Sequence, residues 1–145
     1  SMSHPTDSDC IFCKIVAGTI PCHRLYEDDQ VLSFLDVAPL SRGHALVIPK
    51  GHWVTVDQLP DEVGAAIGAV LPRLSREVCK AVGASAWNIL QNNGKAAHQA
   101  VGHVHFHIIP RTGDAGLGIH WPAGQVDRDD AAKLAKTIST ATAKK

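Results

Sequence analysis

The stretch HVHFHII at residues 103–109 constrains this chain more than any other feature, because it places three histidines at alternate positions of an apolar run. Side chains alternate across a β-strand, so His103, His105 and His107 are predicted to share one face while the apolar residues point into the core. A single histidine on a strand is usually a half-buried ring with satisfied nitrogens. Three histidines on one face need hydrogen-bond partners for two nitrogens on every ring, because unpaired buried polar atoms cost free energy. The run therefore predicts a role beyond packing.

One metal ion is not expected to bind all three rings of this run. A strand rises about 3.3 Å per residue, so its first and third histidines lie roughly 13 Å apart along the backbone. Zinc–nitrogen bonds measure only about 2.1 Å. We therefore expect the roles to be divided between a structural ring and a chemical one. An imidazole titrates near neutral pH and can act as a nucleophile, an acid or a base.

The overall composition narrows the classes of protein to which the chain belongs. Its 145 residues suffice for one domain with a core, and 45% hydrophobic against 19% charged residues is typical of a soluble globular protein. Fourteen basic residues balance fourteen acidic ones, so no bulk nucleic-acid binding is expected. No membrane span and no signal peptide are recognised, and four cysteines are too few for a disulfide framework. We expect a cytoplasmic protein with reduced thiols.

Hydrophobic periodicity predicts an α+β fold in which residues 10–145 form a single domain. Residues 1–9 are expected to be a flexible N-terminus, with Ser1 as the remnant of a removed tag. The remaining segments predict consecutive strands joined by short connections, hence an antiparallel meander of about five strands with a long helix packed on one face. The expected elements are a short helix over 10–18, strands within 23–36 and over 44–49, a long helix over 61–82, strands over 87–91 and 103–110, and a weak helix over 129–143.

The segment CIFC, at residues 10–13, has the Cys-x-x-Cys spacing that lets one metal ion take two thiolates. Two other interpretations remain open, a redox pair and two buried thiols. A redox motif is expected to open a helix after a strand in a βαβ unit, and that pattern is missing here. The spacing by itself leaves the metal site and its alternatives about equally favoured.

Longer matches around these motifs connect the chain with a known family. The stretches FLDVAPLSRGHALVIPK (34–50) and NNGKAAHQAVGHVHFHIIPR (92–111), with HWP at 120–122, resemble the histidine triad family of nucleotide-binding proteins and hydrolases. Within it the sequence is similar to the small phosphoramidase-like branch that carries a Cys-x-x-Cys zinc site. The resemblance runs from about Cys10 to Arg111 and implies the HIT-like fold. It also implies a homodimer that acts on a purine nucleotide.

The resemblance implies an enzyme that cleaves nucleoside 5′-monophosphate derivatives at the α-phosphorus. His105 is then the nucleophile and forms a covalent nucleotidyl-histidine intermediate. His107 contacts the phosphate, and His44 lies close to the nucleophile and orients it. Alternatives are a dinucleoside polyphosphate hydrolase, or a nucleotide-binding regulatory protein whose hydrolysis is incidental.

The resemblance also assigns binding residues. Asp36 matches a carboxylate that accepts hydrogen bonds from the ribose, and Asn92 and Gln99 match positions that contact phosphate or sugar. An apolar slot for the base is implied at residues that serve equally well as plain core: Ile11, Phe12, Ile15, Phe34 and Val37.

Zinc ligands are implied at Cys10 and Cys13, joined by His52 and His103. Four protein ligands close a tetrahedral site and leave no position for a substrate water, so such a zinc is structural. A zinc-dependent hydrolase is therefore the least favoured hypothesis.

Two positions depart from the family pattern. Some members have glycine where this chain has His98, and some have a serine that protonates the leaving group where this chain has Ala100. That serine's role cannot be transferred to Ala100, so the source of the leaving group's proton stays open. Another residue or water has to supply it.

Overall fold

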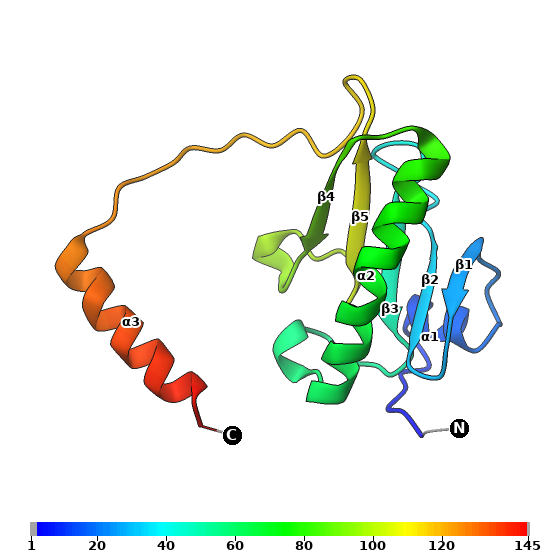
Figure 1. Cartoon of the computed structure of the whole chain (residues 1–145). Helices are drawn as coiled ribbons and strands as arrows, with labels where there is room; N and C mark the ends of the chain where they lie inside the picture. The colour runs from blue at the N-terminus through cyan, green and yellow to red at the C-terminus, as the bar shows by residue number, and fades with distance from the viewer. Residues whose placement is uncertain (1–2, 145) are drawn as a thin grey trace.

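A five-stranded antiparallel sheet organises the chain in a computed structural model that describes residues 3–144 (Figure 1). Ser1 and Met2, which include the expected tag remnant, lie outside the described residues. The strands, in their order across the sheet, are β1 (Arg24–Glu27), β2 (Val31–Leu35), β3 (Ala45–Pro49), β5 (Phe106–Arg111) and β4 (Ala86–Gln91). The predicted α+β class, with its antiparallel sheet and single long helix, is confirmed. The meander holds for the first three strands, and the last two exchange places because helix α2 carries the chain past β5 to the sheet edge.

The two faces of the sheet are covered by different helices. Helix α2 (Asp61–Val82) places its apolar stripe, including Ile67 and Val70, on the face that carries Val47 and Ile108. Helix α1 (Ile11–Val16) packs on the opposite face of β2 and β3 through its own apolar side chains. Successive strand residues alternate between these two clusters, as the period of two requires. The start of α1 and the segment that precedes β5 are thereby brought to the same face, where Phe12 contacts His103 and His105.

Strand β5 is shorter than the predicted strand over 103–110, since it begins at Phe106. It pairs with β3 only from Phe106 opposite Val47 to Ile108 opposite Ala45. Two residues further along β3 comes Pro49, which has no N–H to donate to a ladder. His103 and His105 therefore lie before the strand, and only His107 lies within it.

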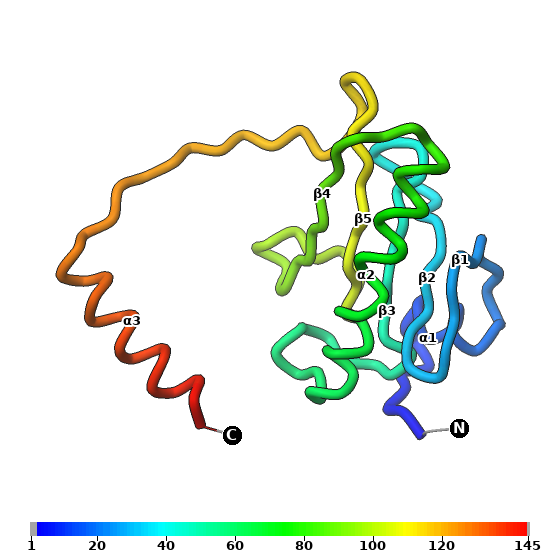
Figure 2. Tube along the Cα trace, viewed as in Figure 1, coloured from blue at the N-terminus to red at the C-terminus, as the bar shows by residue number. Residues whose placement is uncertain are grey.

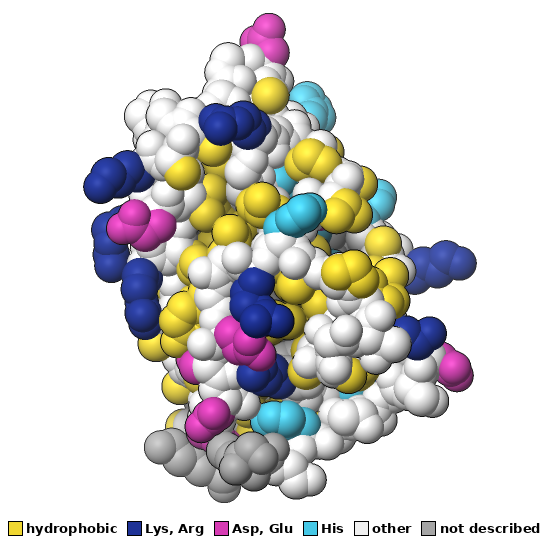
Figure 3. All heavy atoms as spheres, turned by 90° about the vertical axis from the view of Figure 1, so that its right-hand side faces the viewer, with side chains coloured by type: hydrophobic (Ala, Val, Ile, Leu, Met, Phe, Trp, Pro, Cys, Tyr) yellow, Lys and Arg dark blue, Asp and Glu magenta, His cyan; other side chains and the backbone are white. Residues whose placement is uncertain are grey.

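The C-terminal part of the chain leaves the sheet as an extended arm after β5 and ends in helix α3 (Arg128–Thr142), well separated from the sheet (Figure 2). Short 3₁₀ turns occur at Val56–Gln58 and Lys95–Ala97. Among residues 3–144, no helix is both long enough and apolar enough to cross a bilayer. On the face in Figure 3, lysine and arginine are scattered among acidic side chains, consistent with the balanced total charge.

Candidate active site and metal centre

His105 is held in one tautomer by the segment that precedes β5. Its Nδ1 lies 2.7 Å from the backbone oxygen of His103. A carbonyl only accepts, so Nδ1–H donates this bond and Nε2 of the neutral ring keeps a free lone pair. The ring is 5% exposed and stands edge-on to Phe12, with the two centroids 5.2 Å apart. His105 therefore presents a nucleophilic nitrogen from a fixed position.

A chain of hydrogen bonds also fixes the tautomer of His107. The Leu40 N–H donates to His44 Nδ1 at 3.0 Å, so the proton of the neutral His44 ring is on Nε2. His44 Nε2 lies 2.9 Å from His107 Nδ1 and donates to it. The remaining proton of His107 is consequently on Nε2. His107 can offer this N–H to an oxygen atom beside His105, whose ring centroid is 4.9 Å away.

Burial keeps both rings of this relay neutral. It lowers the pKa of His107 to about 4, and neighbouring His105 and His44 act in the same direction. Burial also lowers the pKa of His44, although the Asp36 carboxylate opposes the shift. At neutral pH each ring thus has one donor and one acceptor nitrogen, as the relay requires.

Asp36 completes a cluster with His44 and His107 whose geometry resembles a metal site. Its Oδ2 lies 3.5 Å from His44 Nε2, and its Oδ1 accepts the N–H of Ala38 at 2.8 Å. A metal ligand nitrogen must be unprotonated, whereas His44 Nε2 carries the proton because its Nδ1 accepts from a backbone N–H. The positions of the ring protons therefore favour a hydrogen-bonded relay over a metal at this cluster.

The loop between β4 and β5 is held together by Gln99. Its amide oxygen accepts the N–H of Gly94 at 2.7 Å, and its Nε2 donates to the oxygens of Val54 and Val101 at 2.6 and 3.0 Å. The Asn92 side chain donates to the oxygen of His98 at 3.4 Å. These bonds shape the loop beside His105, and the phosphate or sugar contacts of Asn92 and Gln99 stay a prediction.

The five residues expected in the base slot divide into two groups. Phe12, Ile15 and Phe34 are buried in the cluster between α1 and the sheet, so most of their surface is already used by the core. Ile11 is 48% exposed and Val37 is 86% exposed. Only these two offer free apolar surface for a base, and their role also stays a prediction.

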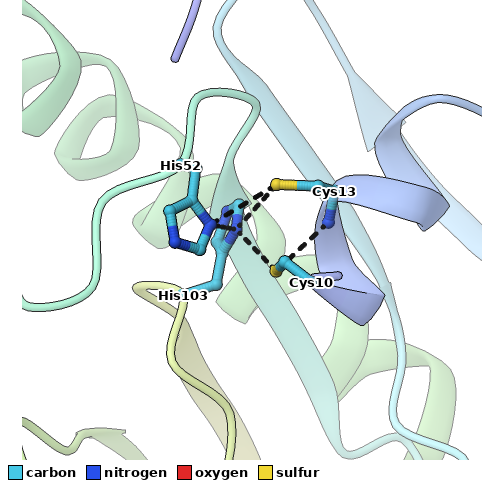
Figure 4. Close-up of side chains that lie close together, drawn as sticks. All are labelled: Cys10, Cys13, His52 and His103. Carbon is cyan, nitrogen blue, oxygen red and sulfur yellow. Dashed lines mark hydrogen bonds between the residues drawn. The ribbon is translucent and has the colours of Figure 1, made fainter. Parts of the chain in front are cut away.

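A second cluster lies next to the first and contains the four expected zinc ligands. Cys10 and Cys13 come from the start of α1, His52 from the loop after β3, and His103 from the segment before β5 (Figure 4). Their side chains point towards a common centre, and the four ligand atoms lie within 4.8 Å of one another. The resemblance is needed to link these residues, because they are distant in sequence.

The distances in this cluster fit a tetrahedral zinc ion. Bonds of about 2.3 Å to sulfur and about 2.0 Å to nitrogen place neighbouring ligand atoms roughly 3.3–3.8 Å apart. His103 Nδ1 lies 3.4 Å from Cys10 Sγ, 3.7 Å from Cys13 Sγ and 3.3 Å from His52 Nδ1. His103 Nε2 lies 2.9 Å from the oxygen of Pro49 and donates to it, which leaves Nδ1 free to bind a metal. The four residues can hold a metal ion.

Several groups that shape the two clusters were not predicted from the sequence. The Leu40 N–H and the Pro49 and His103 carbonyls fix the ring tautomers, and backbone groups carry no residue-type signal. The Asp7 carboxylate lies 3.8 Å from His52 Nε2. Asp7 sits three residues before the Cys-x-x-Cys motif, and its carboxylate type was the one available hint.

The comparison with protein families agrees with this arrangement. The family model described as "HIT domain" matches residues 17–114, about two thirds of the chain. The chain belongs to the HIT family. The match includes the three histidines of 103–107 and His44, whereas Cys10 and Cys13 lie before it.

Other HIT proteins are similar over almost the whole chain. Adenosine 5′-monophosphoramidase hnt1 of Schizosaccharomyces pombe is 51% identical over 132 residues, which are 90% of this chain and 96% of that protein. A hypothetical protein from Leishmania major has a TM-score of 0.91 at 48% identity, covering 97% of this chain and 100% of that one. A Zn-bound histidine triad family protein from Mycobacterium smegmatis has a TM-score of 0.70 at 40% identity, covering 91% and 97%.

Proposed function

We propose that this HIT protein is a nucleotide phosphoramidase-type hydrolase. Its substrates are derivatives of purine nucleoside 5′-monophosphates, cleaved at the α-phosphorus. A relative that is 51% identical bears the name adenosine 5′-monophosphoramidase, which supports this substrate class. The observation that carries the proposal is the tautomer of His105, whose Nδ1–H is bound to the His103 oxygen so that Nε2 is free to attack.

The reaction proceeds in two steps. His105 Nε2 attacks the α-phosphorus, the leaving group departs, and a nucleotidyl-histidine forms. Water then attacks the same phosphorus and releases the monophosphate. His107 donates its Nε2–H to a phosphate oxygen as negative charge develops there, in the orientation set by His44. The Asp36 carboxylate binds the ribose hydroxyls, and Ile11 and Val37 contact the base.

The experiment that tests this function traps the intermediate. The protein is mixed with adenosine and guanosine phosphoramidates, quenched in the first turnovers, and the modified residue is mapped by mass spectrometry. We expect a nucleotidyl group on His105. The His105→Gly variant is expected to lose the adduct and turnover while still binding AMP. Unchanged kcat in that variant, or an adduct on another residue, contradicts the proposal.

One observation favours a second function. Ala100 offers no hydroxyl to the leaving group, and a slow departure is what a nucleotide-binding regulatory protein with incidental hydrolysis would show. A dinucleoside polyphosphate hydrolase is a further alternative within the same chemistry. Steady-state assays with an adenosine phosphoramidate and a dinucleoside polyphosphate separate the three: tight AMP binding without turnover of either substrate favours the regulatory protein.

The metal held by Cys10, Cys13, His52 and His103 is proposed to be zinc in a structural role. The tetrahedral spacing and the two-sulfur, two-nitrogen donor set support this choice. When bound, zinc ties α1 to the segment that carries His105. Among the described residues no cysteine is in a disulfide, and the compartment we propose is the cytoplasm, where thiolate zinc ligands stay reduced.

We propose that the protein acts as a homodimer. Strand β4 lies at the sheet edge, with Trp87 and Ile89 exposed by 45% and 47%. The C-terminal arm exposes Trp121, and α3 exposes Leu134 and Ile138. A second copy that covers these surfaces would remove them from water. Sedimentation at micromolar concentration is expected to give twice the chain mass.

A further inference from the structure

His98 is the one residue other than glycine with a positive φ among residues 3–144, at +68°. In this left-handed region a side chain meets the neighbouring carbonyl, and glycine avoids that cost. His98 is exposed, and the described part of the chain provides no hydrogen bond to its ring. Packing therefore does not compensate for the unfavourable backbone. Such conformations concentrate at functional sites.

The loop that carries His98 lies beside the nucleophile. It starts after Gln91, whose partner across the ladder is Phe106, the residue next to His105. It ends at Gln99, whose amide donates to the oxygen of Val101, and that same oxygen accepts the N–H of His103. The N–H groups of His98 and Gln99 donate to the oxygens of Lys95 and Gly94, so the loop is rigid. His98 is therefore held in a loop whose two ends adjoin the segment that carries His105.

Among the described residues close to His105, few groups can release a proton to a leaving amine. The Nδ1–H of His105 is bound to a carbonyl, and His107 is a neutral ring that donates a hydrogen bond without losing its proton. Ala100 has no protic group. Among residues 92–102 the amides of asparagine and glutamine do not transfer protons. Two side chains remain, Lys95 and His98, and an imidazole is the better acid near neutral pH.

We propose that His98 is the residue that protonates the leaving group, in place of a hydroxyl at position 100. This inference rests on the proposed function. As His105 Nε2 forms its bond to phosphorus, the bond to the leaving nitrogen breaks and that nitrogen takes a proton from the His98 imidazolium. The neutral His98 then takes a proton from the water that attacks the nucleotidyl-histidine. Its charge is restored, and the products are an amine and the monophosphate.

The test compares two substrates that differ in their need for a proton. An adenosine phosphoramidate of an alkyl amine releases a strongly basic nitrogen, whereas the p-nitrophenyl ester of AMP releases a stable anion. General acids contribute about 10²–10⁴-fold. His98→Gly is expected to lower kcat on the phosphoramidate at least about 100-fold more than on the ester. His98→Asn, which also tolerates the left-handed backbone, is expected to show the same selectivity.

Two controls separate catalysis from structure. Lys95 is the other side chain of this loop that can release a proton, and it begins the 3₁₀ turn Lys95–Ala97. Lys95→Ala is expected to affect kcat equally on the two substrates. His98→Gly is expected to raise the melting temperature because it relieves the backbone, so its loss of activity cannot come from unfolding. Equal losses of kcat on both substrates in His98→Gly, or a selective loss in Lys95→Ala, overturn the role of His98 but leave the proposed function standing. No turnover of either substrate by the unmodified protein overturns the proposed function, and this inference with it.

Discussion

His44 Nε2 lies 2.9 Å from His107 Nδ1, although 63 residues separate the two histidines in sequence. His44 comes just before β3 and His107 lies in β5, and the pairing of these neighbouring strands places Leu46 opposite His107. The contact matters because it determines which nitrogen of His107 carries the proton. It assigns His44 a positioning role that acts through His107.

Replacing His44 by alanine is expected to lower kcat about 100-fold, the cost of a misplacement of roughly 1 Å at a reacting centre. The His107 ring loses the donor that fixes its tautomer, and the Leu40 N–H loses its acceptor. AMP affinity, measured by calorimetry, is expected to change much less than kcat. His23→Ala, at an exposed histidine outside the relay, is the matched control and should keep the original kcat.

The pH dependence of stability is expected to report the half-buried His107. Its pKa is about 4 in the folded chain against an ordinary 6.5, so between these values the unfolded chain binds more protons. The free energy of unfolding therefore falls as pH drops from about 6.5 to 4, with one such group adding a slope of up to about 1.4 kcal/mol per pH unit.

The His107→Gln variant isolates this contribution, since any loss of metal with acid affects both proteins. Urea unfolding of both proteins at several pH values gives the free energy of unfolding at each pH. For the variant this free energy is expected to change less steeply with pH. If the free energy of unfolding changes equally with pH in both proteins between pH 4 and 6.5, the pKa of His107 is not lowered in the folded chain.

Gly43 is expected to tolerate no side chain, because of both its conformation and its neighbours. Its φ is +90°, and a Cβ there would lie 2.8 Å from Val82 Cγ1. Gly43→Ala is expected to destabilise the fold by about 1–3 kcal/mol and to lower kcat by displacing His44. Gly68→Ala is the control: it meets nothing within 4 Å in the middle of α2, and is expected to add about 0.5–1 kcal/mol. Thermal unfolding measures both.

The sequence predicted the elements well because their signals are local. The periodicity over 61–82 matches α2 at both ends, and the alternation in HVHFHII correctly placed Ile108 in the core beneath α2. The start of β5 was missed, since it depends on Pro49 in another strand. The order of β4 and β5 across the sheet was missed for a similar reason, because local patterns do not encode which strand pairs with which.

The sites were predicted less completely than the fold. Residue types and spacing identified the Cys-x-x-Cys motif and the three histidines, but joining Cys10 to His52 needed the resemblance to a family. The tautomers of His105 and His107 depend on backbone groups that no sequence pattern marks. The sequence marked His98 only as a position where some family members have glycine. Its positive φ is the conformation that glycine adopts most easily.

Loss of the metal is expected to unfold the protein before it affects the chemistry. Cys13→Ser removes one of four ligands, so elemental analysis is expected to show less than one zinc per chain and calorimetry a lower melting temperature. Cys22→Ser is the matched control, at a thiol outside the cluster, and should keep its zinc. Below the melting temperature the activity of Cys13→Ser is expected to follow its folded fraction, because four protein ligands leave the metal no position for substrate or water. A folded, zinc-free protein without any turnover would instead make the metal part of the reaction, and the division between an anchoring His103 and a reacting His105 would be wrong.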